Sequence, residues 1–202
     1  MNGHETEVKF FVRDLKQVEL RLHKLKAQLI QPRVHEINLR YDNAGSDLRR
    51  EFKVLRLRKD NEAKFTYKGP SEELTGGVLR RREIEFTVGD FDQAGQFLEA
   101  LGFKPILFYE KFRTTYELEG VHIMLDELPY GEFVEIEGED ITILRKVATS
   151  LELNWDVMVK AGYHAIFERA AGKYKLDPAQ LSFKALERTF ITSEDLNIFP
   201  AD

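Results

Sequence analysis

The sequence predicts an α+β fold, an eight-stranded antiparallel β-barrel with a charged interior and flanking helices, and three observations favour it. Segments in which charged and apolar residues alternate recur from the N-terminus to about residue 137. Such alternation is typical of strands, because successive side chains of a strand point to opposite faces. Segments with apolar residues at helical spacing lie between and after these strands. The charged faces carry Arg, Lys and Glu far more often than Ser, Thr or Asn.

The charged faces are expected to point into the barrel. The ordinary interpretation of an alternating strand places its polar face in water, where ion pairs contribute little. Here the amphipathic helices must cover an apolar sheet surface, which is then the outside of a closed sheet. About eight strands enclose enough space for side chains or one small ligand. A wet, ligand-filled interior avoids the large cost of burying unpaired ions in a dry one.

The sequence pattern of the N-terminal half predicts one helix and several strands. Residues 4–12 alternate regularly and are expected as a strand. Asp14 is a good N-cap for a helix whose apolar residues recur as far as Leu29, and Pro32 is expected to end that helix. Residues 42–47 are expected as a loop. Further strands are expected over residues 34–41, 53–58, 64–68 and 78–88.

Glycines mark most of the remaining boundaries. Gly69-Pro70-Ser71 and Gly76-Gly77 bracket an expected loop. Asp90 is expected to start a helix that Gly102 ends in a left-handed cap. Glu119-Gly120 is the expected turn of a hairpin. The remaining expected elements are strands over residues 107–118, 121–128 and 132–137, and helices over residues 141–151 and 156–171.

The composition is that of a globular protein. The chain has 202 residues, of which 43% are hydrophobic and 32% are charged, and this length suits one large domain or two small ones. No low-complexity linker divides the chain. One domain is therefore expected over residues 1–173, with residues 174–202 as a tail packed on it.

Several classes of protein are disfavoured. The chain has no cysteine, which excludes disulfides and thiolate metal sites, and its net charge of −5 disfavours a general nucleic-acid surface. The N-terminus lacks the features of a signal peptide, and no apolar stretch approaches the roughly 20 residues that span a bilayer. We expect a cytoplasmic monomer or homodimer that binds a small molecule rather than nucleic acid or membrane.

The charged positions come in pairs or triplets spaced two residues apart, so that each set shares one face of its strand. A surface lined with both acids and bases suits a metal ion and a polyanion bound together. The sets are Glu5-x-Glu7-x-Lys9, Arg56-x-Arg58, Thr66-x-Lys68, Glu83-x-Glu85, Lys111-x-Arg113 and Glu135-x-Glu137.

This ordered series resembles the CYTH superfamily, the triphosphate tunnel metalloenzymes. Glu5-x-Glu7-x-Lys9 is similar to the ExExK signature of the family, and the resemblance continues in order as far as Glu137. The family includes class IV adenylate cyclases, thiamine triphosphatases and inorganic triphosphatases. The resemblance implies an eight-stranded tunnel that binds a triphosphate together with Mg²⁺ or Mn²⁺.

The carboxylates are the expected metal ligands, because hard cations take oxygen ligands. The resemblance favours Glu5, Glu7 and Glu137, with Asp126 and Glu135 next. The alternative for Asp126 and Glu135 is a simple ion pair with a lysine. Glu83 and Glu85 are further expected tunnel carboxylates.

The basic residues are the expected triphosphate cradle. Arginines grip phosphate oxygens bidentately, whereas lysines act as point charges. The alternative for each is an ion pair with a tunnel glutamate. The resemblance assigns catalytic roles to Lys9, Lys68 and Arg113, where Lys9 would orient water or stabilise charge. It assigns substrate binding to Arg56, Arg58, Lys68, Arg82, Lys111 and Arg113.

One arginine position stays open. The motif match favours Arg82, but strict alternation places Arg81 on the face of Glu83 and Glu85. A β-bulge could reconcile the two.

The expected function is divalent-metal-dependent hydrolysis of inorganic triphosphate or a small organic triphosphate such as thiamine triphosphate. The alternative is a class IV adenylate cyclase that converts ATP to cyclic AMP and pyrophosphate, which Lys111-x-Arg113 would suit. A third alternative is a non-catalytic polyphosphate-binding module. The many tunnel carboxylates disfavour that module, because a pure anion binder gains nothing from them.

Overall fold

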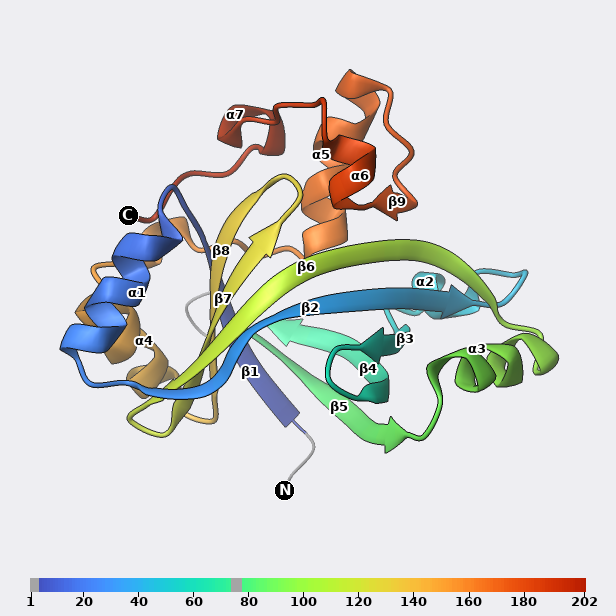
Figure 1. Cartoon of the computed structure of the whole chain (residues 1–202), viewed down its shortest axis with the longest axis horizontal. Helices are drawn as coiled ribbons and strands as arrows, with labels where there is room; N and C mark the ends of the chain where they lie inside the picture. The colour runs from blue at the N-terminus through green and yellow to red at the C-terminus, as the bar shows by residue number, and fades with distance from the viewer. Residues whose placement is uncertain (1–3, 74–77) are drawn as a thin grey trace.

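The computed structural model describes residues 4–73 and 78–202, and eight of its strands form one sheet that closes into a ring (Figure 1). The strands are β1 (His4–Val12), β2 (Gln28–Asp42), β3 (Val54–Lys59), β4 (Ala63–Glu73), β5 (Leu79–Val88), β6 (Lys104–Leu118), β7 (Val121–Leu128) and β8 (Gly131–Gly138). Their order is β2-β3-β4-β5-β1-β8-β7-β6, and β2 pairs with β6 to close the ring. All eight neighbouring pairs are antiparallel, which confirms the predicted fold class.

Helices flank the ring, and the two N-caps named above are confirmed. Asp14 accepts hydrogen bonds from the backbone amides of Lys16 and Gln17, and Asp90 accepts one from Gln93. None of the helices in the described ranges is long and apolar enough to cross a membrane. The helices are α1 (Leu15–Lys24), α2 (Asp47–Arg50), α3 (Phe91–Ala100), α4 (Ile141–Ser150), α5 (Tyr163–Tyr174), α6 (Phe183–Leu186) and α7 (Ser193–Leu196).

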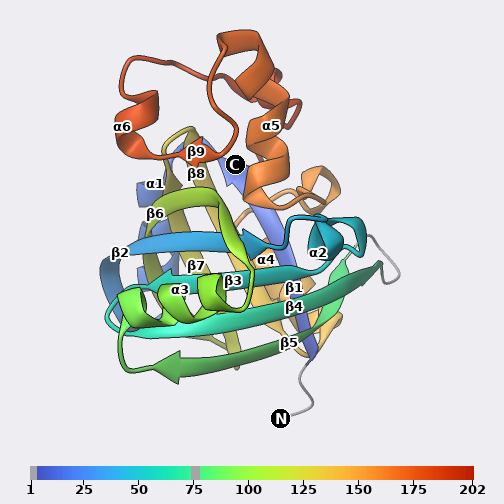
Figure 2. The ribbon, with the colours of Figure 1, turned by 90° about the vertical axis from the view of Figure 1, so that its right-hand side faces the viewer.

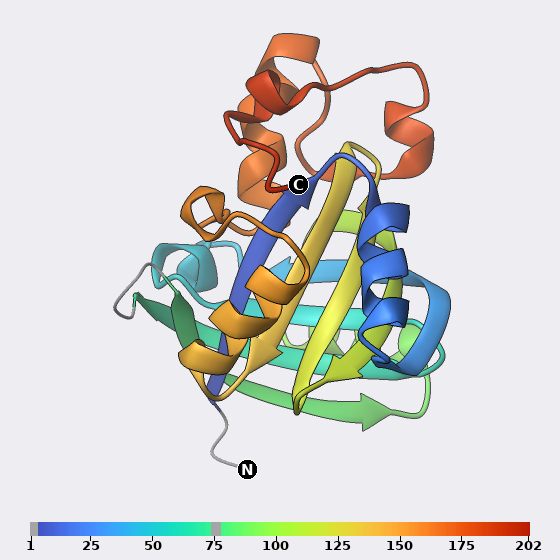
Figure 3. The ribbon, with the colours of Figure 1, turned by 90° about the vertical axis from the view of Figure 1, so that its left-hand side faces the viewer.

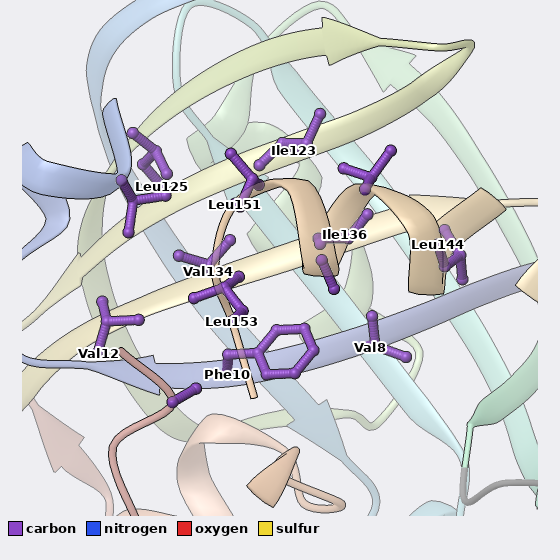
Figure 4. Packing of buried hydrophobic residues seen from close by; sticks show 14 of the residues in the cluster. Val8, Phe10, Val12, Ile123, Leu125, Val134, Ile136, Leu144, Leu151 and Leu153 are labelled. Atoms are coloured by element: carbon purple, nitrogen blue, oxygen red, sulfur yellow. The ribbon is translucent and has the colours of Figure 1, made fainter. Parts of the chain in front are cut away.

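The main apolar core lies outside the ring. Figure 3 shows α1 and α4 packed against the outer face of β1, β8 and β7. Phe10 of β1 and Ile136 of β8 are fully buried there in one cluster with Leu144 of α4 and with Leu151, which directly follows that helix (Figure 4). Because these residues alternate with the charged ones, their burial under helices turns the charged faces towards the interior.

A smaller core covers part of the opposite wall. Figure 2 shows β3, β4 and β5 side by side, with α3 lying over them. Leu57 of β3 packs against Ala94 and Leu98 of α3. On β5 the outward side chains of Ile84 and Phe86 remain exposed, so the helical cover over this wall is incomplete.

The C-terminal region forms a third core and completes one edge of β1. β5 pairs with β1 only as far as Glu7. Beyond that point the carbonyl of Lys9 accepts a hydrogen bond from the amide of Val159 at 2.7 Å, and that of Phe11 accepts one from Ala201 at 2.9 Å. The third core, which includes Phe133 of β8, packs beneath α5. A short strand, β9 (Gln180–Leu181), adds to β6 in parallel.

Three predicted boundaries were wrong. α1 ends at Lys24, and Pro32 lies inside β2, where the pairing with β6 shifts register on either side of Gln31. Such irregularities admit a proline, which cannot donate to the sheet. The helix expected from residue 156 starts at Tyr163, after a 3₁₀ turn over Trp155–Val157.

Only part of the loop expected after Lys68 lies among the described residues, and that part is a strand. Gly69-Pro70-Ser71 belongs to β4 rather than to a loop. The Gly76-Gly77 segment lies outside the described residues.

Candidate functional site

Acids and bases of β1 and β8 face each other inside the ring. Lys9 is the direct cross-strand partner of Glu135, and Glu7 is the partner of Glu137. Lys9 Nζ lies 2.5 Å from Glu135 Oε1, with Lys9 only 5% exposed. Burial alone would lower the pKa of Lys9, but Glu135 and Glu7 outweigh burial and raise that pKa. The shifted pKa therefore favours the protonated form of Lys9 at neutral pH.

A second cluster centres on Arg113 of β6. Its Nε donates to Asp126 Oδ1 at 2.6 Å, and its guanidinium also contacts Glu135. Lys111 Nζ donates to Asp126 Oδ2 at 2.9 Å, and Asp126 is 0% exposed. Lys9 and Arg113 hold the pKa of Glu135 well below its ordinary value, although burial alone would raise it. Asp126 and Glu135 are thus engaged by cations in this state, which is the ion-pair alternative considered above.

Tyr163 joins this cluster from α5, far along the chain. Its hydroxyl donates to Asp126 Oδ2 at 2.7 Å, and Lys9 Nζ lies 4.4 Å from the centre of its ring. Burial raises the pKa of the Tyr163 phenol well above its ordinary value, so the hydroxyl remains a donor. No sequence signal points to Tyr163, because it lies beyond the charged series that ends at Glu137.

The wall formed by β3, β4 and β5 carries basic residues paired with glutamates. Arg58 donates to Glu85 Oε1 at 3.0 Å. Lys68 Nζ lies 2.6 Å from Glu83 Oε2. Arg56 donates to Thr66 Oγ1 at 3.1 Å, and that hydroxyl donates in turn to Glu85. The structure therefore brings Arg56, Arg58 and Lys68 together, with glutamates in contact where phosphates are expected to bind.

The strand β2 contributes two interior residues that the sequence analysis missed. Glu36 is 1% exposed, and its carboxylate lies 3.7 Å from both Lys111 Nζ and an Arg58 guanidinium nitrogen. Asn38 is 0% exposed and donates from Nδ2 to Glu36 Oε1 at 3.0 Å. The signal was present, since Glu36, Asn38 and Arg40 alternate with apolar residues as the other charged sets do.

The ionisation of Glu36 should make the folding stability depend on pH. Burial alone would raise the pKa of Glu36, but Lys111 and Arg113 outweigh it and hold that pKa far below its ordinary value. Its contribution to stability is thus present above the unfolded-state pKa of about 4.3 and is lost as the pH falls. We expect Glu36→Gln to lose about 1.5–3 kcal/mol at neutral pH and to depend less on acid than the wild type.

Urea unfolding at neutral pH and at about pH 3, well below the unfolded-state pKa, measures this difference. Glu62→Gln, a change at an exposed glutamate, is the control and should follow the wild type at both values. Equal stability losses for Glu36→Gln at both pH values would show that Glu36 is not held ionised.

The arginine register is settled in favour of Arg81. Its guanidinium lies 3.9 Å from Glu7 Oε1, whereas Arg82 is exposed and lies on the other face of β5. The expectation for Arg82 was wrong because the bulge lies in β4, between Lys68 and Ser71, and leaves the alternation of β5 intact. Glu5 pairs with Arg81 through β1 and β5, but its side chain lies outside what the structure describes.

A pocket of about 270 Å³ opens from this interior beside the turn between β3 and β4. All of its described lining residues are polar or charged, and they include Glu36, Arg58, Lys64 and Arg113. Sites for drug-sized ligands usually enclose about 300–1,000 Å³ and are mostly apolar. The pocket suits a small, highly charged ligand.

Glu7 and Glu137 are the carboxylates best suited to a metal ion. Like charges directly opposite each other destabilise a sheet, and a cation between them would relieve the repulsion. Mg²⁺ commonly uses only one or two carboxylates, together with water and substrate phosphates. The described side chains form no group of three or more His, Asp or Glu that could hold a metal, so a complete protein cage is not present among them.

Comparison with known proteins agrees with this geometry. The family profile of the CYTH domain matches residues 3–160. A protein from Vibrio parahaemolyticus, proposed to be an adenylate cyclase, has a similar structure with a TM-score of 0.74 and 22% identity, over 83% of this chain and 99% of that one. The PH1012 protein of Pyrococcus horikoshii OT3 has a TM-score of 0.66 and 27% identity, over 79% of this chain and 96% of that one.

A third similar structure comes from Hippeastrum. That protein, proposed to be an adenylyl cyclase, reveals a dominant triphosphatase activity. Its TM-score is 0.60 and its identity 21%, over 81% of this chain and 95% of that one. No curated protein sequence matches this chain significantly.

Proposed function

This chain belongs to the CYTH domain family, and we propose that it hydrolyses a small triphosphate inside the ring with the help of Mg²⁺ or Mn²⁺. The observation that carries the proposal is the convergence of basic residues from β3, β4 and β6 opposite the paired carboxylates of Glu7 and Glu137. Transfer of a phosphoryl group depends mainly on alignment and charge neutralisation, and this arrangement supplies both.

Glu7 and Glu137 would hold the metal ion, with Glu5 as the further ligand that the family resemblance suggests. When bound, the ion would neutralise negative charge on the phosphate oxygens. Lys9, which pairs with Glu135 and lies 3.8 Å from Glu7, would add a positive charge beside it.

The basic wall would bind the triphosphate by exchanging partners. In this state Arg58 pairs with Glu85, and Lys68 pairs with Glu83. Phosphate oxygens would replace those carboxylates, with Arg56, Lys111 and Arg113 completing the cradle. Because the glutamates already hold the cations in place, little rearrangement is needed when the substrate enters.

Two observations favour hydrolysis over formation of cyclic AMP. The pocket is small and its described lining is polar, so it offers no apolar or aromatic surface on which an adenine would stack. The Hippeastrum protein of similar fold has a dominant triphosphatase activity. Adenylate cyclase activity is the second candidate, favoured by the likeness to the Vibrio parahaemolyticus protein.

The test is to incubate the purified protein and Mg²⁺ or Mn²⁺ with inorganic triphosphate, thiamine triphosphate and ATP in turn. We expect release of orthophosphate, abolished by a chelator. Formation of cyclic AMP and pyrophosphate from ATP would instead identify the protein as an adenylate cyclase. Tight binding of inorganic triphosphate without turnover of any compound would point to a binding module instead.

A further inference from the structure

The side-chain carbonyl of Asn38 is a buried acceptor inside the ring. Asn38 Nδ2 donates to Glu36 Oε1. Because an ionised carboxylate can only accept, the atom facing Glu36 must be the amide nitrogen of Asn38 and not its oxygen. The oxygen Oδ1 is then the atom left over. It is buried and has no hydrogen-bond partner among the described residues.

The surroundings of Asn38 identify where this acceptor lies. Its direct cross-strand partners are Arg58 of β3 and Tyr109 of β6, and directly opposed side chains in a sheet lie next to each other. Tyr109 is also within 3.4 Å of an Arg56 guanidinium nitrogen. Asn38 therefore lies among the cations that would hold the phosphates.

The buried atoms without a hydrogen bond in this region include both donors and an acceptor. The Nε atoms of Arg56 and Arg58 are also buried without a hydrogen-bond partner among the described residues, although Arg58 Nε lies 3.7 Å from Asp60 Oδ2. As donors they suit phosphate oxygens. Asn38 Oδ1 is an acceptor, and it would repel a phosphate oxygen at the same place. Leaving a buried acceptor without a donor is costly, so the group that fits Oδ1 is a hydrogen-bond donor, such as the O–H of the attacking nucleophile.

We propose that Asn38 Oδ1 accepts a hydrogen bond from the oxygen nucleophile that attacks the triphosphate, and holds it beside the phosphorus bound by Arg56 and Arg58. This inference rests on the proposed function. The nucleophile is water in hydrolysis and a substrate hydroxyl in cyclisation, and both present the same O–H. A neutral amide suits this role because it adds no negative charge among phosphates.

The amide positions the nucleophile and takes no proton. The nucleophile's oxygen forms a bond to phosphorus, while the bond between phosphorus and the bridging oxygen breaks. The bridging oxygen leaves on the departing phosphate with the bonding electron pair. The proton of the nucleophile passes to a phosphate oxygen or to solvent.

The test compares Asn38→Leu, which removes both amide functions, with Asn38→Ser, whose neutral hydroxyl keeps an oxygen acceptor. We expect Asn38→Leu to lower kcat by up to ~100-fold, because a displaced nucleophile can cost that much. The affinity for inorganic triphosphate, measured by calorimetry with Mg²⁺, should stay unchanged. Asn38→Ser should retain more turnover than Asn38→Leu.

Equal turnover in the two variants overturns the inference, because an oxygen acceptor at residue 38 would then not be needed. A parallel loss of affinity and turnover, or an unaffected Asn38→Leu, also overturns it while leaving the proposed function standing. A wild-type protein inactive on every compound overturns both. Water labelled with heavy oxygen separates the two nucleophiles, since only hydrolysis places the label in the product phosphate.

Discussion

Replacement of Arg113 by leucine should cost about 3–5 kcal/mol of folding free energy, the largest effect we expect from a single change in this protein. Arg113 compensates two buried carboxylates at once, Asp126 and Glu135. Removing one partner of a buried ion-pair network leaves the remaining charges undercompensated. Without Arg113, Asp126 would keep only Lys111 and Glu135 only Lys9 among the cations described above. Urea unfolding followed by circular dichroism measures the loss.

Arg33→Leu is a matched control for this experiment. Arg33 makes a bidentate pair with Glu127 at 2.7 and 2.9 Å, but it is 51% exposed. Exposed pairs of this kind contribute at most about 1 kcal/mol. Similar losses in the two variants would show that the interior cluster is no more important than a surface pair. If Arg113→Leu does not fold, Arg113→Lys, which keeps the charge, should fold and show a smaller loss.

Glu7→Gln should lower turnover at least ~100-fold, a few kcal/mol of transition-state stabilisation. Among the described residues, the cations that contact Glu7 lie at long range, 3.8 Å for Lys9 and 3.9 Å for Arg81, so its carboxylate is placed to serve an ion. The amide also removes the repulsion with Glu137, so the metal-free variant should be at least as stable as the wild type. Turnover titrated with Mg²⁺ and urea unfolding without metal give the two results.

Glu139→Gln provides the comparison for this change, because Glu139 is an exposed glutamate two residues after Glu137. It should retain normal turnover. Wild-type rates in Glu7→Gln would remove this carboxylate from the mechanism, and a large loss of stability without metal would mean that Glu7 is structural instead.

The fold could be predicted from the sequence because its pattern is local. Val8 and Phe10 alternate with the charged residues Glu7 and Lys9 on β1, and that alternation alone determines which side chains share a face. The number and order of charged strands then favoured a closed sheet. The register of Arg81 and Arg82 stayed open because it depended on which strand carries a bulge, and only the pairing of β4 with β5 reveals that.

The site was harder to predict than the fold. Glu36 and Asn38 had the same alternation as the other interior residues, but an asparagine in a mixed set is a weaker signal than a row of like charges. Tyr163 could not be found at all, since its contact with Asp126 joins α5 to β7 and has no local pattern. The partners of Asp126 and Glu135 likewise depend on cross-strand neighbours that a single strand does not specify.

The bonds from Val159 and Ala201 to β1 also bear on how the chain folds during synthesis. The strand that carries Glu7 and Lys9 leaves the ribosome well before Val159 and Ala201, which cover its far edge. Contacts between such distant residues are slow to form. In the meantime the carbonyls of Lys9 and Phe11 would present a bare strand edge, which is a template for association with other chains. Nascent molecules of this protein should therefore be prone to aggregate until Val159 and Ala201 have been synthesised.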